Sequence, residues 1–128
     1  MPFGGNDWHT LTEEPTLEPE IPICDPHHHL WDRPNNRYML EDLIEDTRGH
    51  NVRQTVFVEC TSMYRADGPE ELRVVGETEF VQGVAAKSAS GGYGETRVAT
   101  GIQSLILISE PTRRYAISYA VFRLQKKT

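Results

Sequence analysis

The sequence predicts an α/β fold with about three parallel strands and two helices. Short apolar or β-branched segments alternate with segments of helical periodicity, in the order strand, helix, strand, helix, strand. This alternation is typical of a parallel sheet covered by helices, because parallel strands need a crossover connection. The chain has 128 residues and 38 % hydrophobic residues, which fits one domain with a modest core.

The first half of the predicted unit contains two strands and a helix. A strand is expected at residues 21–24, ending at Asp25-Pro26, and a turn at residues 33–36. A helix over about residues 38–48 has one apolar face, formed by Leu40, Leu43, Ile44 and Thr47. The second strand, residues 52–60, is continuously apolar at its centre, as in strands buried on both faces.

The second half adds a helix and a strand. Pro69 followed by two acidic residues indicates a helix start, because proline fits the first turn and acids favour the positive end of the helix dipole. The helix is expected to run to about Ala89, with its apolar positions at Leu72, Val75, Phe80 and Val84. A glycine-rich segment then ends it, and a third strand is expected at residues 97–108.

Charge and composition divide the chain into three segments. Residues 1–20 form an acidic, proline-rich segment that is expected to be an extended leader, and residues 21–102 form the α/β unit. Residues 103–128 are a basic tail: residues 1–101 carry 18 acidic and 8 basic side chains, whereas residues 102–128 carry one acidic and five basic. A frameshift product and a genuine new tail both account for this change.

The composition argues against several classes of partner. The net charge of −6 disfavours nucleic acid, and no apolar run reaches the roughly 18 residues of a membrane span. The leader lacks the basic start and apolar stretch of a secretory signal. Cys24 and Cys60 lie in apolar segments and are predicted to be reduced, buried thiols of a cytoplasmic protein.

A run of three histidines follows the first predicted strand, in the sequence Asp25-Pro26-His27-His28-His29-Leu30-Trp31. Residues i and i+2 of an extended segment point to the same side, so His27 and His29 would face one way and His28 the other. Two imidazoles on one side can share a zinc ion at about 2.0–2.1 Å from each nitrogen. A solvated loop with weak adventitious metal binding is the alternative, and catalytic zinc sites have three protein ligands.

Three further residues are candidates for substrate binding. Glu59 ends the second strand and either binds a ligand or pairs with a base such as Arg65. Arg65 lies on the following loop, where barrel enzymes recognise substrates. Trp31 either lines a pocket or packs in the core.

The motif D-x-H-x-H-L-W within residues 21–31 resembles the first-strand motif of the amidohydrolase-related family, whose members form TIM barrels. Residues 38–43, 49–60, 63–69 and 75–81 are similar to later segments of its lactonase-like branch. The resemblance implies a metal-dependent hydrolase of a lactone or other cyclic ester or amide. It also implies that His27 and His29 are ligands of a divalent metal, zinc by the family pattern, and that full-length relatives bind a small-molecule substrate.

The resemblance covers residues 21–102, whereas a TIM barrel needs about 250 residues. We therefore expect the N-terminal portion of a barrel, a truncated TIM barrel with an incomplete metal site and no hydrolase activity of its own. The family's later histidines and aspartate have no counterpart, since no histidine follows His50. A non-catalytic fragment or a small metal-binding or interaction module is the alternative function. The exposed edge of a partial sheet predicts self-association.

Overall fold

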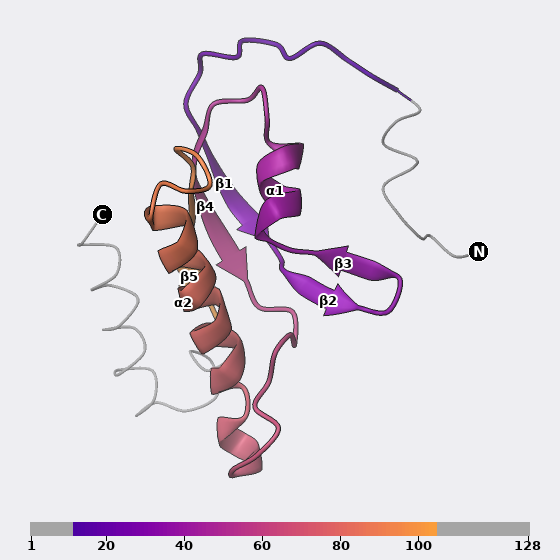
Figure 1. The fold of residues 1–128 in the computed structure, drawn as a ribbon, viewed down its shortest axis with the longest axis vertical. Coiled ribbons are helices and arrows are strands. Elements are labelled where there is room, and N and C mark those ends of the chain that lie inside the picture. Colours follow the sequence, from indigo (N-terminus) through magenta and orange to yellow (C-terminus); the bar gives the residue numbers. More distant parts are fainter. Residues whose placement is uncertain (1–11, 105–128) are drawn as a thin grey trace.

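A parallel sheet of three strands forms the centre of the fold (Figure 1). The structure is a computed structural model, and it describes residues 12–104. The strands are β1 (Ile23–His28), β4 (Val52–Val58) and β5 (Arg97–Gln103), in the spatial order β1-β4-β5. Together with two α-helices they confirm the predicted α/β class, three parallel strands included.

Both helices pack on the same face of the sheet. Helix α1 (Leu40–Asp46) connects β1 to β4, and α2 (Val75–Ala89) connects β4 to β5 after a 3-10 turn, η2 (Glu70–Leu72). The carboxylate of Asp42 accepts the backbone N–H of Met39 at 2.9 Å, which satisfies one of the free donors at the start of α1. Helix α2 packs chiefly against β5, and α1 lies next to β3 (Asn36–Tyr38).

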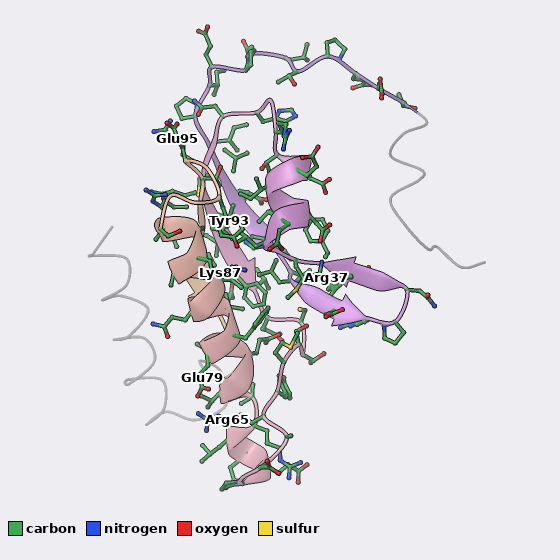
Figure 2. All side chains as sticks on the ribbon, viewed as in Figure 1. Arg37, Arg65, Glu79, Lys87, Tyr93 and Glu95 are labelled. Atoms are coloured by element: carbon green, nitrogen blue, oxygen red, sulfur yellow. The ribbon has the colours of Figure 1, made fainter. Side chains whose placement is uncertain are left out.

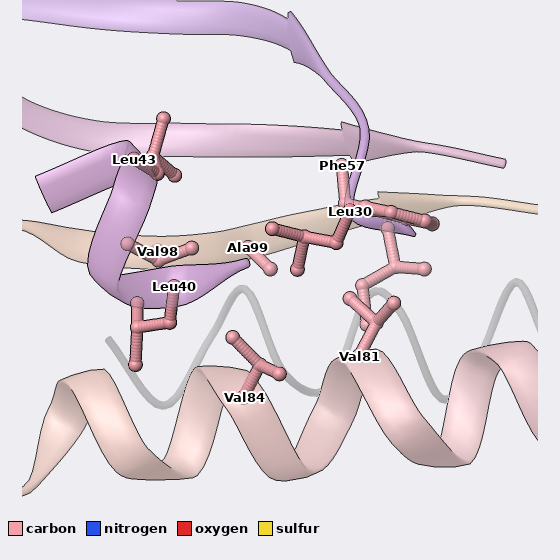
Figure 3. Packing of buried hydrophobic residues seen from close by; sticks show 9 residues of the cluster. Leu30, Leu40, Leu43, Phe57, Val81, Val84, Val98 and Ala99 are labelled. Carbon is pink, nitrogen blue, oxygen red and sulfur yellow. The ribbon is translucent and has the colours of Figure 1, made fainter. Parts of the chain in front are cut away.

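The core lies between this helical face and the sheet (Figure 3). Leu40 and Leu43 from α1 meet Val81 and Val84 from α2, over residues of the strands and their ends. Burial of an aliphatic or aromatic side chain of this size contributes about 1.5–3 kcal/mol. The cluster consists of Leu30, Leu40, Leu43, Phe57, Val81, Val84, Val98, Ala99 and Ile102.

A small antiparallel hairpin extends from the end of β1. Its strands are β2 (Trp31–Arg33) and β3 (Asn36–Tyr38), joined by a turn in which Asn35 has a φ of 61°. The sequence predicted the turn but not the two strands. Because β3 includes Tyr38, α1 begins later than the expected residue 38.

Two element boundaries differ from prediction. Strand β1 continues to His28 instead of ending at Asp25-Pro26, with a register shift between Asp25 and His28. Pro26 is tolerated because β1 pairs only with β4 among the described residues, so no partner needs a proline N–H. Helix α2 begins at Val75 rather than near Pro69, where only the 3-10 turn forms.

The buried face of α2 also differs from the predicted one. It includes Glu77, Val81, Val84 and Ser88, at helical spacing, whereas Val75 and Phe80 are only half-buried. The polar members are buried because they bond to backbone: the Ser88 hydroxyl accepts the N–H of Val98 at 3.0 Å. A pattern of apolar residues alone cannot reveal such positions.

The two cysteines correct another prediction. Both are free thiols, but Cys24 is exposed and Cys60 is half-buried, so neither is a fully buried thiol. Cys24 lies in the first part of β1, where Ile23 is exposed as well. Val56 and Val58 are likewise only half-buried, so the face of β4 away from the helices is not fully covered by the described residues.

Some predictions lie outside the described residues. These are the first part of the leader, residues 1–11, the end of the third strand at residues 105–108, and the basic tail up to residue 128. Residues 12–22 contain no helix or strand and are mostly exposed, as expected of the leader. None of the described helices combines the length and apolar character needed to cross a bilayer.

Candidate functional site

The end of β1 brings His27 and His29 together on one side, as the sequence predicted. Their Nε2 atoms lie 3.4 Å apart, and their rings meet edge to face with centroids separated by 5.0 Å. His27 is exposed and His29 half-buried. The backbone N–H of His27 donates to the Asp25 carboxylate at 3.1 Å, which fixes the start of this segment.

The orientation of His29 is set by β4. Its Nδ1 lies 2.7 Å from the carbonyl oxygen of Val58. A carbonyl can only accept, so Nδ1 carries the proton and Nε2 keeps a free lone pair. A backbone carbonyl behind one ring nitrogen is the usual support of a histidine that binds metal through the other.

The distance between the two Nε2 atoms fits a shared metal ion. Two donors at 2.0–2.1 Å from a tetrahedral zinc ion lie about 3.3–3.4 Å apart. The 3.4 Å separation of His27 and His29 falls in this range, and it is long for a direct N–H···N hydrogen bond. The pair therefore fits two positions of a zinc site.

His28 points to the opposite side and has a structural role. Its ring is buried against Phe57, and its Nε2 lies 2.8 Å from the Thr55 hydroxyl. That hydroxyl also accepts the N–H of Ala99 at 2.8 Å, so its own proton is free for His28. Burial lowers the pKa of His28, which favours the neutral form of the ring.

Trp31 and Arg33 continue the side occupied by the two histidines. The Trp31 ring stacks on His29 with centroids 5.5 Å apart and an angle of 21° between the planes. The Arg33 guanidinium lies 5.3 Å from the centre of the Trp31 ring. Trp31 is only half-buried and is absent from the core cluster, so it belongs to this row rather than to the core. We call His27, His29, Trp31 and Arg33 the open row.

Glu59 and Arg65 occupy different places. Glu59 directly follows β4, is half-buried, and donates its backbone N–H to the carbonyl of Gln103 on β5. Arg65 pairs with Glu79 on α2 (Figure 2), so the suggested pairing of Glu59 with Arg65 does not form. Glu59 is next to Val58, whose carbonyl bonds to His29, whereas Arg65 is bound to a residue of α2.

Glu77 is a residue that the sequence analysis missed. Its side chain is 1 % exposed, and its Oε2 accepts the backbone N–H groups of Cys60 at 3.1 Å and Ser62 at 2.7 Å. Its Oε1 has no hydrogen-bond partner among the described residues. The available signal was an acid at helical spacing from Val81 and Val84, which is unusual for a buried face.

The loop after β4, which contains Cys60 and Ser62, approaches α2 closely. A Cβ on Gly76 would lie 2.5 Å from the carbonyl oxygen of Met63, so only glycine fits there. Thr61 and Met63 have positive φ values of 61° and 58°, which residues other than glycine rarely adopt. The loop after β4 is thus held in a strained conformation by its contacts with α2.

The ligand set at the open row is incomplete within residues 12–104. No group of three His, Cys, Asp or Glu side chains suited to a metal ion occurs among them. His50 lies before β4, at the opposite end of the sheet from the open row. A separate, largely apolar pocket lies between α2 and β5, lined by residues that include Ala85, Ala89 and Ile102, and it contains none of the predicted site residues.

Comparison with known proteins leaves the assignment to the geometry of the chain itself. No protein-family model, curated protein or solved structure matches this chain.

Proposed function

We propose that residues 21–102 form the first part of an amidohydrolase-related TIM barrel in which His27 and His29 supply two ligands of a zinc ion. The strands follow one another in chain order and are parallel, with a helix between each pair. Both helices cover one face, which favours a barrel over a doubly wound sheet with helices on both faces. The histidine pair lies at the carboxyl end of β1 and faces away from the helices, as a ligand at the mouth of a barrel does.

The separation of the two Nε2 atoms carries the proposal. At 3.4 Å it fits two donors of a tetrahedral ion, and the Val58 carbonyl leaves the His29 lone pair free for coordination. The bound metal would supply Lewis-acid chemistry at a carbonyl, which suits hydrolysis of a lactone or another cyclic ester or amide. A catalytic site needs a third protein ligand, which has to come from outside residues 12–104.

Within this function the residues of the chain have distinct tasks. Val58 and Asp25 orient the histidines, and Trp31 covers one face of His29. Glu59 follows Val58 directly, so its carboxylate lies just beyond the carboxyl end of β4. His28 holds β1 to β4 and takes no part in ligand binding.

Zinc titration of the purified chain tests the proposal. Wild type is compared with a His27→Ala/His29→Ala double variant and with His50→Ala, an exposed histidine distant from the pair, in competition with a chromogenic chelator. We expect stoichiometric zinc in wild type and His50→Ala and its loss in the double variant. Equal zinc binding by all three proteins would show that the pair is not a metal site.

Lactone hydrolysis by the zinc-loaded protein then separates an enzyme from a metal-binding module. Because the ligand set is incomplete among the described residues, we expect zinc binding without hydrolysis, and hydrolysis that disappears in the double variant would show that the chain completes a catalytic site. Zinc binding without hydrolysis would leave a metal-binding module as the function of this chain.

A further inference from the structure

We propose that residues 115–121 of this chain dock into the apolar pocket between α2 and β5 and cover the outer edge of β5. The pocket is independent of the proposed metal site, because β5 and β1 lie at opposite edges of the described sheet. It has a volume of about 240 Å³ and lies where α2 packs on β5 (Figure 1). Its lining includes Ala85, Ala86 and Ala89 from α2 and Val98 and Ile102 from β5.

The pocket is open on the side away from β4. Ala86 and Ala89 line it and are nevertheless exposed, so residues 12–104 leave it open to solvent. Within the same residues β5 pairs only with β4, and no strand lies along its other edge. An apolar surface beside an unpaired strand edge invites association unless another segment covers it. One covering segment along β5 would satisfy both the pocket and the edge.

The chain itself continues from this place. Strand β5 ends at Gln103, and residues 105–128 follow it in the sequence. The seven residues of β5 span about 23 Å. The segment 105–114 reaches about 33 Å when extended, and its Pro111 favours a turn. This length is enough to bring residues 115–121 back along β5.

The sequence of residues 115–121 suits an apolar pocket at a strand edge. Tyr115, Ile117, Tyr119 and Val121 alternate with the small residues Ala, Ser and Ala. A period of two is typical of a strand with one apolar side. Placed alongside β5, such a strand would direct its large side chains into the pocket and its small ones to the opposite side.

Charge favours this segment over a second copy of the chain as the occupant. Residues 12–104 carry 17 acidic and 8 basic side chains, whereas residues 105–128 carry one acidic and five basic. The opposite net charges attract the segment to the α/β unit. Two whole chains, each with a net charge of −6, repel one another.

Hydrogen exchange of the full chain tests the docking. Wild type is compared with Ile117→Asp and with the matched control Ser118→Asp, which lies on the other side of the alternation. Removal of a large apolar side chain from the pocket predicts about 10- to 100-fold faster exchange of residues 115–121 in Ile117→Asp. Ser118→Asp should exchange as wild type does. Exchange rates of this segment that are alike in the three proteins would overturn the docking.

Spin labelling locates the segment without altering it, and so does not depend on the folding of Ile117→Asp. A nitroxide is attached at Gly83→Cys on α2, where a new side chain meets no atom within 4 Å, or at Glu45→Cys on α1 as the control, both in a Cys24→Ser/Cys60→Ser background. Stronger broadening of the NMR signals of residues 115–121 by the label on α2 supports the docking. Equal or absent broadening overturns it.

A mixture of spin-labelled chains with separate, isotope-labelled chains identifies which molecule supplies the segment. Docking within one chain predicts no broadening of residues 115–121 in the mixture. Broadening there as strong as within one chain would make a second copy the occupant and overturn the proposal.

Discussion

The carboxyl ends of β1 and β4 are neighbours in the sheet, but they are held in different ways. The end of β1 carries the open row, whose side chains are exposed or half-buried and contact mainly one another. The end of β4 is fixed by the buried carboxylate of Glu77 and by the close approach of its loop to Gly76. One end presents polar atoms to solvent, and the other uses a buried polar atom for support.

The two ends are linked by hydrogen bonds in both directions. His29 bonds to the carbonyl of Val58, Arg33 to that of Cys60, and the Cys60 thiol to that of Leu30. The comparison suggests that the exposed side chains of β1 are ordered by the rigid end of β4. It can be tested by weakening the support of β4 and observing both regions.

Loss of the Glu77 carboxylate should have the largest effect. Glu77→Ala leaves the buried N–H groups of Cys60 and Ser62 without an acceptor, at about 1–3 kcal/mol each, so we expect the free energy of unfolding to fall by about 2–6 kcal/mol. Glu77→Gln keeps one acceptor oxygen and should lose less than half as much. Urea denaturation measures both, and equal losses in the two variants would contradict the role given to the acceptor oxygen.

Gly76→Ala should have an intermediate effect. The new Cβ would lie 2.5 Å from the Met63 carbonyl oxygen and 2.6 Å from the Arg65 nitrogen, both backbone atoms, so the loop must shift at about 1–3 kcal/mol. Gly83→Ala on the same helix is the control. It meets no atom within 4 Å and should stabilise the protein by about 0.5–1 kcal/mol through helix propensity. If thermal melts showed the two variants to be alike, the close loop contact would be ruled out.

Thiol reactivity should show the smallest difference and needs no mutation. Cys24 is exposed on the edge strand, whereas the Cys60 thiol donates to the Leu30 carbonyl. Burial raises the pKa of Cys60, so less of its reactive thiolate is present at neutral pH. Timed alkylation followed by peptide mass spectrometry should label Cys24 first. Faster labelling of Cys60 would indicate that the loop after β4 opens readily.

The prediction of elements was best where the signal is local. The stripe that includes Leu40 and Leu43 predicted α1, because both residues reach the core through one helical face. The extent of β1 was wrong, because a proline was taken as a strand end although an edge strand accommodates it. The hairpin after β1 was also missed, since strands of three residues leave little periodic signal.

For the candidate site, too, residues with a local signal were predicted and those without one were missed. His27 and His29 were placed on one side by the two-residue period of extended chain, and Arg33 was missed because its neighbours gave no motif. Glu77 was missed because buried acids are rare and its partners, Cys60 and Ser62, lie 17 and 15 residues away in the sequence.

The sequence by itself determined the alternation of strands and helices and the side on which each histidine lies, because both depend on periodicities within a few residues. Only the tertiary structure decided which groups meet across the fold. The carbonyl that frees the His29 lone pair is 29 residues away, and the hydroxyl that holds His28 is 27 residues away. Such partners are brought together by parallel pairing of β1 with β4, and no local pattern in the chain specifies that register.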